Sequence, residues 1–295
     1  MKIGDVIRAH GSSLSFEFFP PKDEVSEARL FQTIAKLESF GPTFVSVTYG
    51  AGGGTLKNTR HLVLRIKRET SLTPMPHLTC VDQSKDELKK ILEDYKGQAI
   101  ENVLALRGDP PKGAEKFIPP KNGFCYAVDL VKLTVSVAGY SIGVAVYPEG
   151  HIESLSLEMD MHYTKQKIDS GADFAITQMF FDNHFFYDFM ERAEKAGISI
   201  PIIPGIMPIT DIEKIKRFSQ MCGATLPASL IERMQKATSA DEAQRFGIDF
   251  AIRQCENLWR NGVHYFHFYT LNRSEAVTEI LRNLGLMGKA PPPCG

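Results

Sequence analysis

Short apolar segments alternate along this chain with longer segments in which charged and apolar residues mix. Most of the short segments are continuous apolar runs, and such runs indicate strands that are buried on both faces, as in a parallel sheet covered by helices. The pattern predicts eight strands, at Leu14–Phe18, Thr43–Tyr49, Met75–Cys80, Asn102–Arg107, Ser141–Tyr147, Asp173–Phe180, Ile200–Ile206 and Val263–Thr270.

An amphipathic segment follows each of these strands, as expected for successive βα units. The predicted helices span Glu24–Phe40, Leu56–Thr70, Lys85–Tyr95, Ala127–Ala138, Ser156–Ser170, Asn183–Lys195, Ile212–Gln220 and Arg273–Leu284. Gly41, Gly171 and Gly197 follow three of them, at the C-cap position where a left-handed backbone costs glycine least. A further helical region, Ala228–Asn261 with a break near Thr238–Ala240, precedes the last strand, and Ser239 is expected to cap its second half.

Eight βα units without a shift in composition predict an α/β fold, a (β/α)₈ TIM barrel with extra helices before the last strand. An open, doubly wound sheet is the alternative. Barrels of this kind reach about 250 residues as one unit. We therefore expect residues 1–295 to form a single catalytic barrel domain, with residues 289–295 as a flexible tail.

The composition excludes several classes of protein. Lys and Arg number 34 against 35 Asp and Glu, so there is no basic excess for nucleic acid or a polybasic membrane contact. We find no apolar leader and no run long enough to span a membrane. The five cysteines are scattered, which supports neither a disulfide framework nor a paired metal motif. We expect a cytoplasmic protein without a metal site.

Polar residues gather where the predicted strands end, which is where a TIM barrel places its active site. Polar groups at the ends of apolar strands are costly unless they face a cavity or one another. We therefore predict one polar cluster at the barrel mouth. Its members are Glu17, Thr48, Tyr49, His77, Thr79, Arg107, Gly108, Asp109, Tyr147, His151, Gln178, Tyr269 and Arg273.

Two carboxylates in this cluster are candidates for proton or charge chemistry. Glu17 stands among Phe16, Phe18 and Phe19, and partial desolvation there would suit a general acid. A carboxylate paired with a core arginine is the alternative. Asp109 follows Arg107 in a loop, where an Arg–Asp ion pair is equally compatible with the sequence.

The remaining motifs exclude common cofactor and metal sites. Residues 50–55 form a glycine-rich loop that lacks both the Lys-Ser/Thr of a P-loop and the third glycine of a dinucleotide fingerprint. A nucleotide would therefore not be held in the Rossmann manner. His264 and His267 are three residues apart on a predicted strand, so they face opposite sides and cannot bind one metal ion together.

The strand-end motifs together resemble those of the methylenetetrahydrofolate reductase family, in its short bacterial single-domain form. The resemblance runs from about Ser15 to Leu284. The motifs occur in the family's order and are Phe16-Glu17-Phe18-Phe19-Pro20-Pro21, Ser46-Val47-Thr48-Tyr49-Gly50-Ala51, Pro76-His77-Leu78-Thr79-Cys80, Leu106-Arg107-Gly108-Asp109-Pro110, Ala145-Val146-Tyr147-Pro148, Gly171-Ala172-Asp173 with Ile176-Thr177-Gln178, Pro204-Gly205-Ile206 and Phe268-Tyr269-Thr270-Leu271-Asn272-Arg273.

This resemblance implies FAD at the barrel mouth and the reduction of 5,10-methylenetetrahydrofolate to 5-methyltetrahydrofolate in a ping-pong cycle. Glu17 matches the family's general acid, and Asp109 matches the carboxylate beside the flavin's pyrimidine edge. The electron donor would be NADH or NADPH. The alternative is a flavin-bearing subunit of a larger electron-transfer complex, reduced by an iron–sulfur partner and inactive with nicotinamide alone.

The resemblance also assigns the other site residues. Gln178, Phe218, Tyr269 and Arg273 match substrate positions, and Tyr163, Gln166 and Lys214 depart from the family's usual residues near the ligands. A homo-oligomer in cytoplasmic one-carbon metabolism and methionine biosynthesis is implied as well. The residues that match flavin contacts are Thr48, His77, Arg107, Gly108, Asp109, Tyr126, Ala127, Ala145, Tyr147, His151, Asp160 and Lys167.

Overall fold

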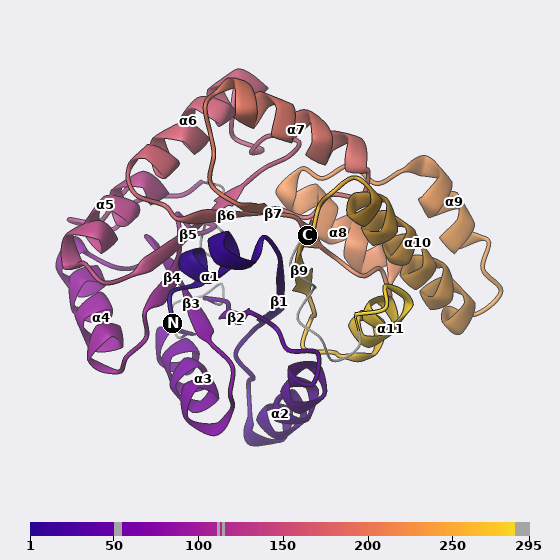
Figure 1. Ribbon diagram of the computed structural model, residues 1–295, viewed down its shortest axis with the longest axis horizontal. Helices are drawn as coiled ribbons and strands as arrows, with labels where there is room; N and C mark the ends of the chain where they lie inside the picture. Colours follow the sequence, from indigo (N-terminus) through magenta and orange to yellow (C-terminus); the bar gives the residue numbers. More distant parts are fainter. Residues whose placement is uncertain (50–54, 111–112, 114–115, 287–295) are drawn as a thin grey trace.

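The computed structural model describes residues 1–49, 55–110, 113 and 116–286, and in this part of the chain every paired strand is parallel to its neighbours. Figure 1 shows the strands as a ring with helices outside it. The strands are β1 Ser13–Phe18, β2 Phe44–Val47, β3 Pro74–Thr79, β4 Asn102–Leu106, β5 Ser141–Val146, β6 Phe174–Thr177, β7 Ile202–Ile203, β8 Gly205–Ile206 and β9 Tyr265–Tyr269.

The sheet closes on itself through residues 202–206. The order of the strands is β7-β6-β5-β4-β3-β2-β1-β9-β8, with β7 bonded to β6 and β8 bonded to β9. Because Pro204 alone separates β7 from β8, these two segments are the halves of one strand that joins both ends of the sheet. The predicted (β/α)₈ barrel is therefore confirmed, and the open doubly wound alternative is wrong.

The interruption at Pro204 follows from its chemistry, because proline has no N–H to donate to a neighbouring strand. Its carbonyl still accepts from the backbone N–H of His267 at 3.0 Å. At the next residue, a Cβ on Gly205 would collide with the carbonyl of Thr177 and lie 2.7 Å from the Tyr269 ring. Only glycine permits this approach, which brings the end of β9 against β6.

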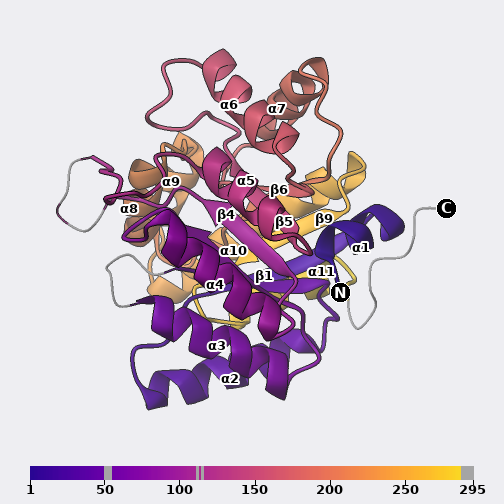
Figure 2. The ribbon, with the colours of Figure 1, turned by 90° about the vertical axis from the view of Figure 1, so that its left-hand side faces the viewer.

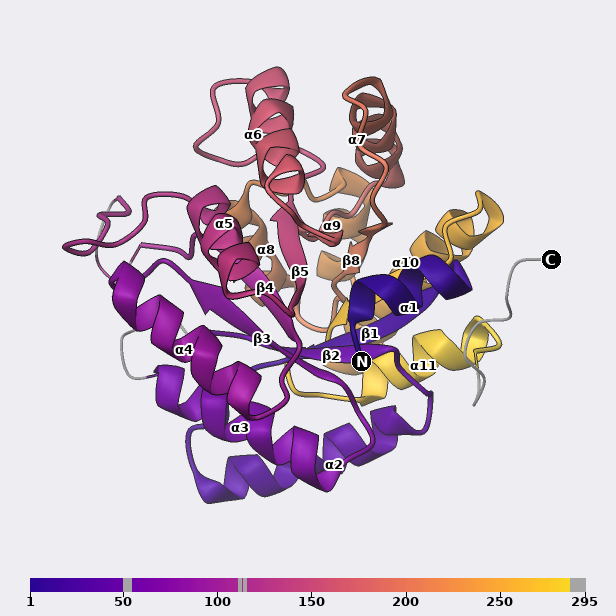
Figure 3. The same ribbon diagram turned by 60° about the vertical axis from the view of Figure 1, so that its left-hand side comes forward.

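The outer helices agree with the predicted ones to within a few residues. Figure 3 shows α2 to α5 following one another around the outside of the barrel. Gly41, Gly171 and Gly197 all have positive φ, and the Ser239 side chain accepts from Glu242 N, so the predicted caps are confirmed. The helices after β1 are α2 Glu24–Glu38, α3 Thr55–Glu69, α4 Lys85–Gly97, α5 Ala127–Val137, α6 Leu157–Asp169, α7 Asn183–Lys195, α8 Ile212–Cys222, α9 Ala228–Gln235, α10 Ala240–Arg260 and α11 Glu275–Asn283.

One helix was not predicted from the sequence. Helix α1, Ile3–His10, lies across the amino-terminal end of the barrel, and Figure 2 shows it on the opposite side of the molecule from α8. Its fully buried Ile3 and Ile7 pack with inward-facing Phe44 and Met75. The side chain of buried Asn102 holds the residues that lead into α1, because it accepts from Ile3 N at 2.8 Å and donates to the Met1 carbonyl at 2.9 Å. Helix α1 therefore closes the bottom of the barrel.

The barrel interior changes in character from one end to the other. Near α1 the inward-facing side chains are apolar and include Phe44, Met75 and Phe174. Toward the carboxyl ends of the strands, buried polar side chains such as Ser15 and His267 replace them. In the described residues the bottom of the barrel interior is filled and capped by α1, so a ligand of the interior would enter from the opposite end.

None of the helices in the described part of the chain combines the length and the hydropathy that a membrane span requires. The predicted tail and the glycine-rich loop at residues 50–54 lie outside the described residues.

Candidate active site at the carboxyl ends of the strands

Glu17 points into the barrel mouth from the end of β1. Strand geometry sends alternate side chains to opposite faces, so Phe16 and Phe18 lie on the outer face, where both are fully buried beneath the helices. Phe19 is 40% exposed. The Glu17 side chain is 18% exposed, so its partial burial was predicted correctly, but the phenylalanine rings are not what buries it. The same alternation puts Ser15 on the inner face with Glu17.

Two buried histidines face the Glu17 carboxylate instead. Nε2 of His77, on β3, lies 3.5 Å from Glu17 Oε2, and Nε2 of His267, on β9, lies 3.7 Å from the same oxygen. Neither of these two Nε2 atoms has a hydrogen-bond partner among the described residues. The other nitrogen of His267, Nδ1, is 2.8 Å from Ser15 Oγ. The carboxylate thus sits between two imidazoles with free polar atoms directed at it.

The protonation of His77 is set by its surroundings. Burial lowers the pKa of His77 to about 4, although the nearby Glu17 carboxylate acts in the opposite direction. The imidazole is therefore neutral at physiological pH. Within the described residues no three His, Cys, Asp or Glu side chains are arranged to hold a metal ion.

His267 was not predicted as a site residue. From the sequence it was considered only as a metal ligand together with His264. The predicted opposite orientations of these two side chains are confirmed, because His267 is fully buried and the His264 ring packs edge-on against Trp259, with 4.5 Å between the ring centres. A signal was present in the sequence, since His267 precedes Tyr269 by two residues and must share its face.

Arg107 and Asp109 do not form the ion pair that the sequence left open. Arg107 binds Glu153 through two hydrogen bonds of 2.5 and 2.8 Å, and its guanidinium lies 5.2 Å from the centre of the Phe117 ring. Asp109 is exposed on the mouth loop. Between them, Gly108 has φ +87, and a Cβ there would approach Val81 Cγ2 to 2.5 Å, so the turn requires glycine.

Four further predicted residues meet beside β5. The Tyr147 and His151 rings pack edge to face at 4.7 Å, and Lys167 Nζ lies 5.8 Å from the Tyr147 ring. Asp160 accepts from His151 N at 3.1 Å through Oδ1, while its buried Oδ2 has no partner in the described part of the chain. The prediction that one face of α6 turns to the mouth is thereby supported for Asp160 and Lys167.

The surroundings shift the pKa values of the ionisable side chains in this group. Burial lowers the pKa of Lys167 to about 8 and raises that of Asp160, and each charge partly offsets the effect of burial on the other. Lys167 Nζ donates to the carbonyl of Ala145 at 2.5 Å. Burial also raises the pKa of the Tyr147 hydroxyl. Among the described residues, the Ala145 carbonyl is the one hydrogen-bond acceptor that the Lys167 ammonium has.

The other predicted flavin contacts lie on neighbouring loops. Tyr126, largely exposed, stands at the N-cap of α5, directly before Ala127. Thr48 follows β2, and its N–H donates to the Phe18 carbonyl at 2.8 Å. Thr48 comes directly after β2, and Tyr126 and Ala127 begin the helix that follows β4, so these contacts come from the part of the sheet between β1 and β5.

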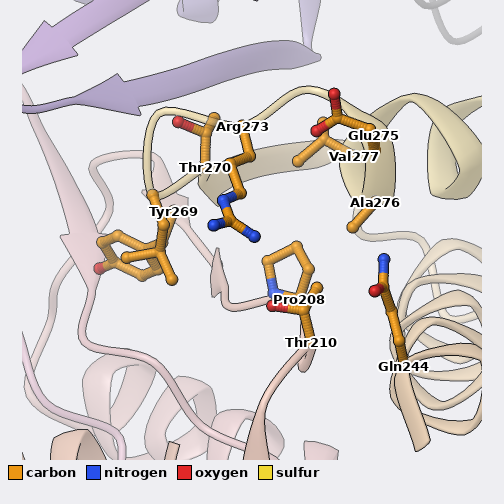
Figure 4. Close-up of a pocket in the computed structure, with 10 residues that line it drawn as sticks. Pro208, Thr210, Gln244, Tyr269, Thr270, Arg273, Glu275, Ala276 and Val277 are labelled. Atoms are coloured by element: carbon orange, nitrogen blue, oxygen red, sulfur yellow. The ribbon is translucent and has the colours of Figure 1, made fainter. Parts of the chain in front are cut away.

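Tyr269 and Arg273 border a pocket of about 160 Å³ after β9. Figure 4 shows the Arg273 side chain directed into it, between Tyr269 and Pro208, with Gln244 of α10 on the far side. The Tyr269 hydroxyl donates to Thr177 O at 2.7 Å. Burial raises the pKa of this hydroxyl, and the Glu17 carboxylate raises it further. The lining residues are Pro208, Thr210, Gln244, Tyr269, Thr270, Leu271, Arg273, Glu275, Ala276 and Val277.

Phe218 and Gln178 lie near the same wall. Phe218 of α8 packs, together with Tyr269, against an apolar cluster that includes Met179 and Met207. The neighbouring Gln178, at the end of β6, accepts from the backbone N–H of Met179 at 2.9 Å through Oε1. Phe218 and Tyr269 thus share one apolar cluster, and Gln178 directly precedes Met179 of that cluster.

The residues that depart from the family's pattern lie toward solvent. Tyr163 is half exposed, Gln166 contacts His162 at 2.9 Å, and Lys214 pairs with Asp211 at 3.1 Å. Their side chains leave the group around Glu17 untouched.

The chain matches known proteins along most of its length. Residues 2–285 match the family described as methylenetetrahydrofolate reductase. The 5,10-methylenetetrahydrofolate reductase of Escherichia coli is 42% identical over 275 residues, which cover 93% of this chain and 91% of the bacterial protein. Methylenetetrahydrofolate reductase (NADH) 1 of Arabidopsis thaliana is 38% identical over 301 residues; the match covers 98% of this chain and about half, 51%, of the plant protein.

Among solved structures, an uncharacterized protein from Clostridium thermocellum that binds two copies of 5-methyl-5,6,7,8-tetrahydrofolic acid has a similar fold. The TM-score is 0.64, with 97% of this chain and 98% of that chain covered, at 13% sequence identity. At this identity the likeness concerns the fold alone.

Proposed function

Because the chain belongs to the methylenetetrahydrofolate reductase family, we propose that it reduces 5,10-methylenetetrahydrofolate to 5-methyltetrahydrofolate with FAD as its cofactor. The observation that supports this most directly is the carboxylate of Glu17, which lies at the barrel mouth between two buried imidazoles. A proton donor at this place is what opening of the methylene bridge requires.

The residues around β5 fit a dinucleotide flavin. Asp160 Oδ2 and the Lys167 ammonium offer an acceptor and a cation on one side of the mouth. Within the ranges that the structure describes, Asp160 Oδ2, Thr79 Oγ1 and His77 Nε2 are all buried polar atoms without hydrogen-bond partners. We assign the flavin contacts to Thr48, His77, Arg107, Gly108, Asp109, Tyr126, Ala127, Ala145, Tyr147, His151, Asp160 and Lys167. When bound, FAD would accept a hydride from a reduced nicotinamide and pass it to the folate, which is a ping-pong cycle.

Glu17 supplies the proton for the folate half of the reaction. Breaking the bond between the bridging methylene and its leaving nitrogen requires protonation of that nitrogen, and Glu17 is the acid directed into the mouth. The iminium that forms is a cation, so the carboxylate left on Glu17 stabilises it. The exposed Asp109 adds a second negative charge near the flavin and tunes its potential.

The substrate lies along the wall formed by Gln178, Phe218, Tyr269 and Arg273. The apolar cluster around Phe218 suits the flat rings of a folate or a nicotinamide. Arg273, directed into the pocket after β9, suits a carboxylate. The Tyr269 hydroxyl donates a hydrogen bond to the Thr177 carbonyl, which fixes the ring as one wall of this pocket.

NADH is the donor we propose, because a plant relative is named for it. Cytoplasmic location, a homo-oligomer and an iron–sulfur partner subunit stay predictions. The experiment that tests the proposal is anaerobic mixing of the FAD-loaded protein with NADH, NADPH or reduced ferredoxin in parallel, followed by methylenetetrahydrofolate.

We expect NADH to bleach the visible absorbance of the flavin and methylenetetrahydrofolate to restore it. A folded protein that cannot be loaded with FAD, or a bleached flavin that methylenetetrahydrofolate leaves bleached, would overturn the proposal. Bleaching by ferredoxin alone would support the alternative, a flavin-bearing subunit of a larger electron-transfer complex.

A further inference from the structure

The strand that bears Glu17 is fastened to its neighbour beyond the point where the two strands stop pairing. The ladder between β1 and β9 ends at the pair Glu17 and Tyr269. Side chains from the turn after β9 continue it. Thr270 Oγ1 donates to the Glu17 carbonyl at 2.6 Å. The side-chain amide of Asn272 accepts from Phe19 N at 3.0 Å and donates to Phe19 O at 2.8 Å.

This turn has a strained backbone. Leu271 has φ 51 and Asn272 has φ 57, so two consecutive residues other than glycine adopt the left-handed conformation. This conformation is unfavourable for residues other than glycine, so it persists only where the surrounding structure stabilises it. Here Asn272 N donates to Thr270 Oγ1 at 3.1 Å, and Asn272 O accepts from Thr33 Oγ1 at 3.3 Å. The strained turn directs the Asn272 amide back at β1.

The bonds hold the three peptide groups that directly follow the Glu17 side chain, from the β9 side and from the β2 side. The carbonyls of Glu17 and Phe19 accept from the β9 turn, while the Phe18 carbonyl between them accepts from Thr48 N at 2.8 Å on the β2 side. Because these three peptides cannot shift, the carboxylate keeps its place between the two imidazoles. Arg273, the residue after Asn272, is placed in its pocket by the same turn.

We propose that Asn272 is a positioning residue for the folate half of the reaction. This inference rests on the proposed function, and it assigns to Asn272 a role that acts through Glu17 and Arg273 without contact with the reacting atoms. Displacing a catalytic group by about 1 Å can cost on the order of 100-fold in rate. Flavin reduction by a nicotinamide does not need the proton from Glu17, so it does not depend on this turn.

The test compares three FAD-loaded variants with the wild type. Asn272→Gly removes both hydrogen bonds to Phe19 and introduces a residue that adopts positive φ without steric cost. Asn272→Asp keeps the acceptor and loses the donor. Asn261→Gly is the matched control, because it also removes a side-chain bond to a carbonyl, that of Asn257, but at the opposite end of β9.

Four quantities are measured: exchange of the Phe19 amide hydrogen, the thermal midpoint, the rate of each half-reaction, and the pH profile of the folate half-reaction. For Asn272→Gly we expect at least about tenfold faster Phe19 exchange, a folate half-reaction slowed by about 10- to 100-fold with a shifted pH profile, and flavin reduction at the wild-type rate. Asn272→Asp should fall between Asn272→Gly and the wild type. Asn261→Gly should match the wild type in both half-reactions.

Three results would overturn the inference. They are an unchanged Phe19 exchange rate, a folate half-reaction at the wild-type rate despite faster exchange, and an equal slowing of both half-reactions, which would indicate a general loss of structure. If the wild type itself cannot reduce methylenetetrahydrofolate, the proposed function fails instead. The Phe19 exchange rate then still decides whether Asn272 holds the end of β1.

Discussion

Nε2 of His77 lies 3.5 Å from Oε2 of Glu17, yet the two side chains are not a charged pair at neutral pH. Burial lowers the pKa of His77 to about 4, so the imidazole is neutral wherever the enzyme would work. The proposed acid therefore has a polar but uncharged neighbour.

This relationship predicts how stability depends on pH. A histidine whose folded pKa lies below its unfolded value of about 6.5 favours the folded state above that value and loses this contribution as the pH falls. We expect the free energy of unfolding of the FAD-loaded protein to fall by up to roughly 3 kcal/mol between pH 6.5 and 4 on account of His77. Urea titrations of wild type and His77→Gln across this range measure the difference, which should shrink in the variant.

The exposed His184 provides the control, because His184→Gln should leave the pH dependence as it is in the wild type. Equal pH dependence in His77→Gln and wild type would contradict the buried, neutral state of His77.

Replacement of Glu17 by glutamine tests the proposed proton donor. Glutamine keeps the size of the side chain between the two imidazoles but cannot protonate the leaving nitrogen. We expect NADH to bleach the flavin of Glu17→Gln at the wild-type rate, while methylenetetrahydrofolate restores it about 100- to 10,000-fold more slowly. Anaerobic stopped-flow absorbance separates the two rates. Glu24→Gln, on the exposed start of α2, should behave as wild type; two unimpaired half-reactions in Glu17→Gln would mean that another group donates the proton.

The barrel could be predicted because its signals are local. Continuous apolar runs identified all the strand positions, and the segments between them had helical periodicity and capping residues. Helix α1 was missed because only Ile3, Val6 and Ile7 mark its apolar face among charged neighbours. What makes it a helix is burial against the bottom of the barrel, and that surface exists only once residues far along the chain have assembled.

In the candidate site, too, features set by the local sequence were predictable and contacts between distant residues were not. The strand-end rule placed Glu17 and Tyr269 correctly, because their positions follow from strand alternation. The partners of these residues were not predictable in the same way. Arg107 binds Glu153, which is 46 residues away, and Glu17 meets His77 and His267 from two other strands. Such pairs depend on how strands and loops are stacked, which local sequence does not determine.

Truncating a buried side chain of α1 should lower the stability of the protein without affecting cofactor binding. The fully buried Ile7 fills the bottom of the barrel interior, and truncating a buried isoleucine costs about 2–5 kcal/mol because it leaves a cavity. We expect Ile7→Ala to lower the free energy of unfolding by this amount and to leave FAD affinity unchanged. Val25→Ala, at a position that is 63% exposed on α2, should change stability by less than about 0.5 kcal/mol. An Ile7→Ala protein as stable as the wild type would show that α1 does not close the barrel in solution.

Lys167 predicts a pH dependence of cofactor binding. Burial lowers the pKa of its ammonium to about 8, so the free protein loses this charge at mildly alkaline pH. The pyrophosphate of FAD stays anionic in that range and would stabilise the charged form, which means that affinity is highest below pH 8 and falls as the pH rises above it. Fluorescence titrations with FAD between about pH 6.5 and 9 measure this slope. We expect Lys167→Met to bind FAD about 10- to 100-fold more weakly at pH 7 and to lose the slope, since a charge-assisted bond contributes about 1.5–3 kcal/mol.

Lys165→Met is the matched control for that experiment. Lys165 lies on the same helix but pairs with Asp169, which is mostly exposed. Its loss should leave both the affinity for FAD and the dependence on pH unchanged. A flat pH profile in the wild type, or the same loss of affinity in both variants, would show that Lys167 does not meet the pyrophosphate and that the cation there is a structural partner of the Ala145 carbonyl.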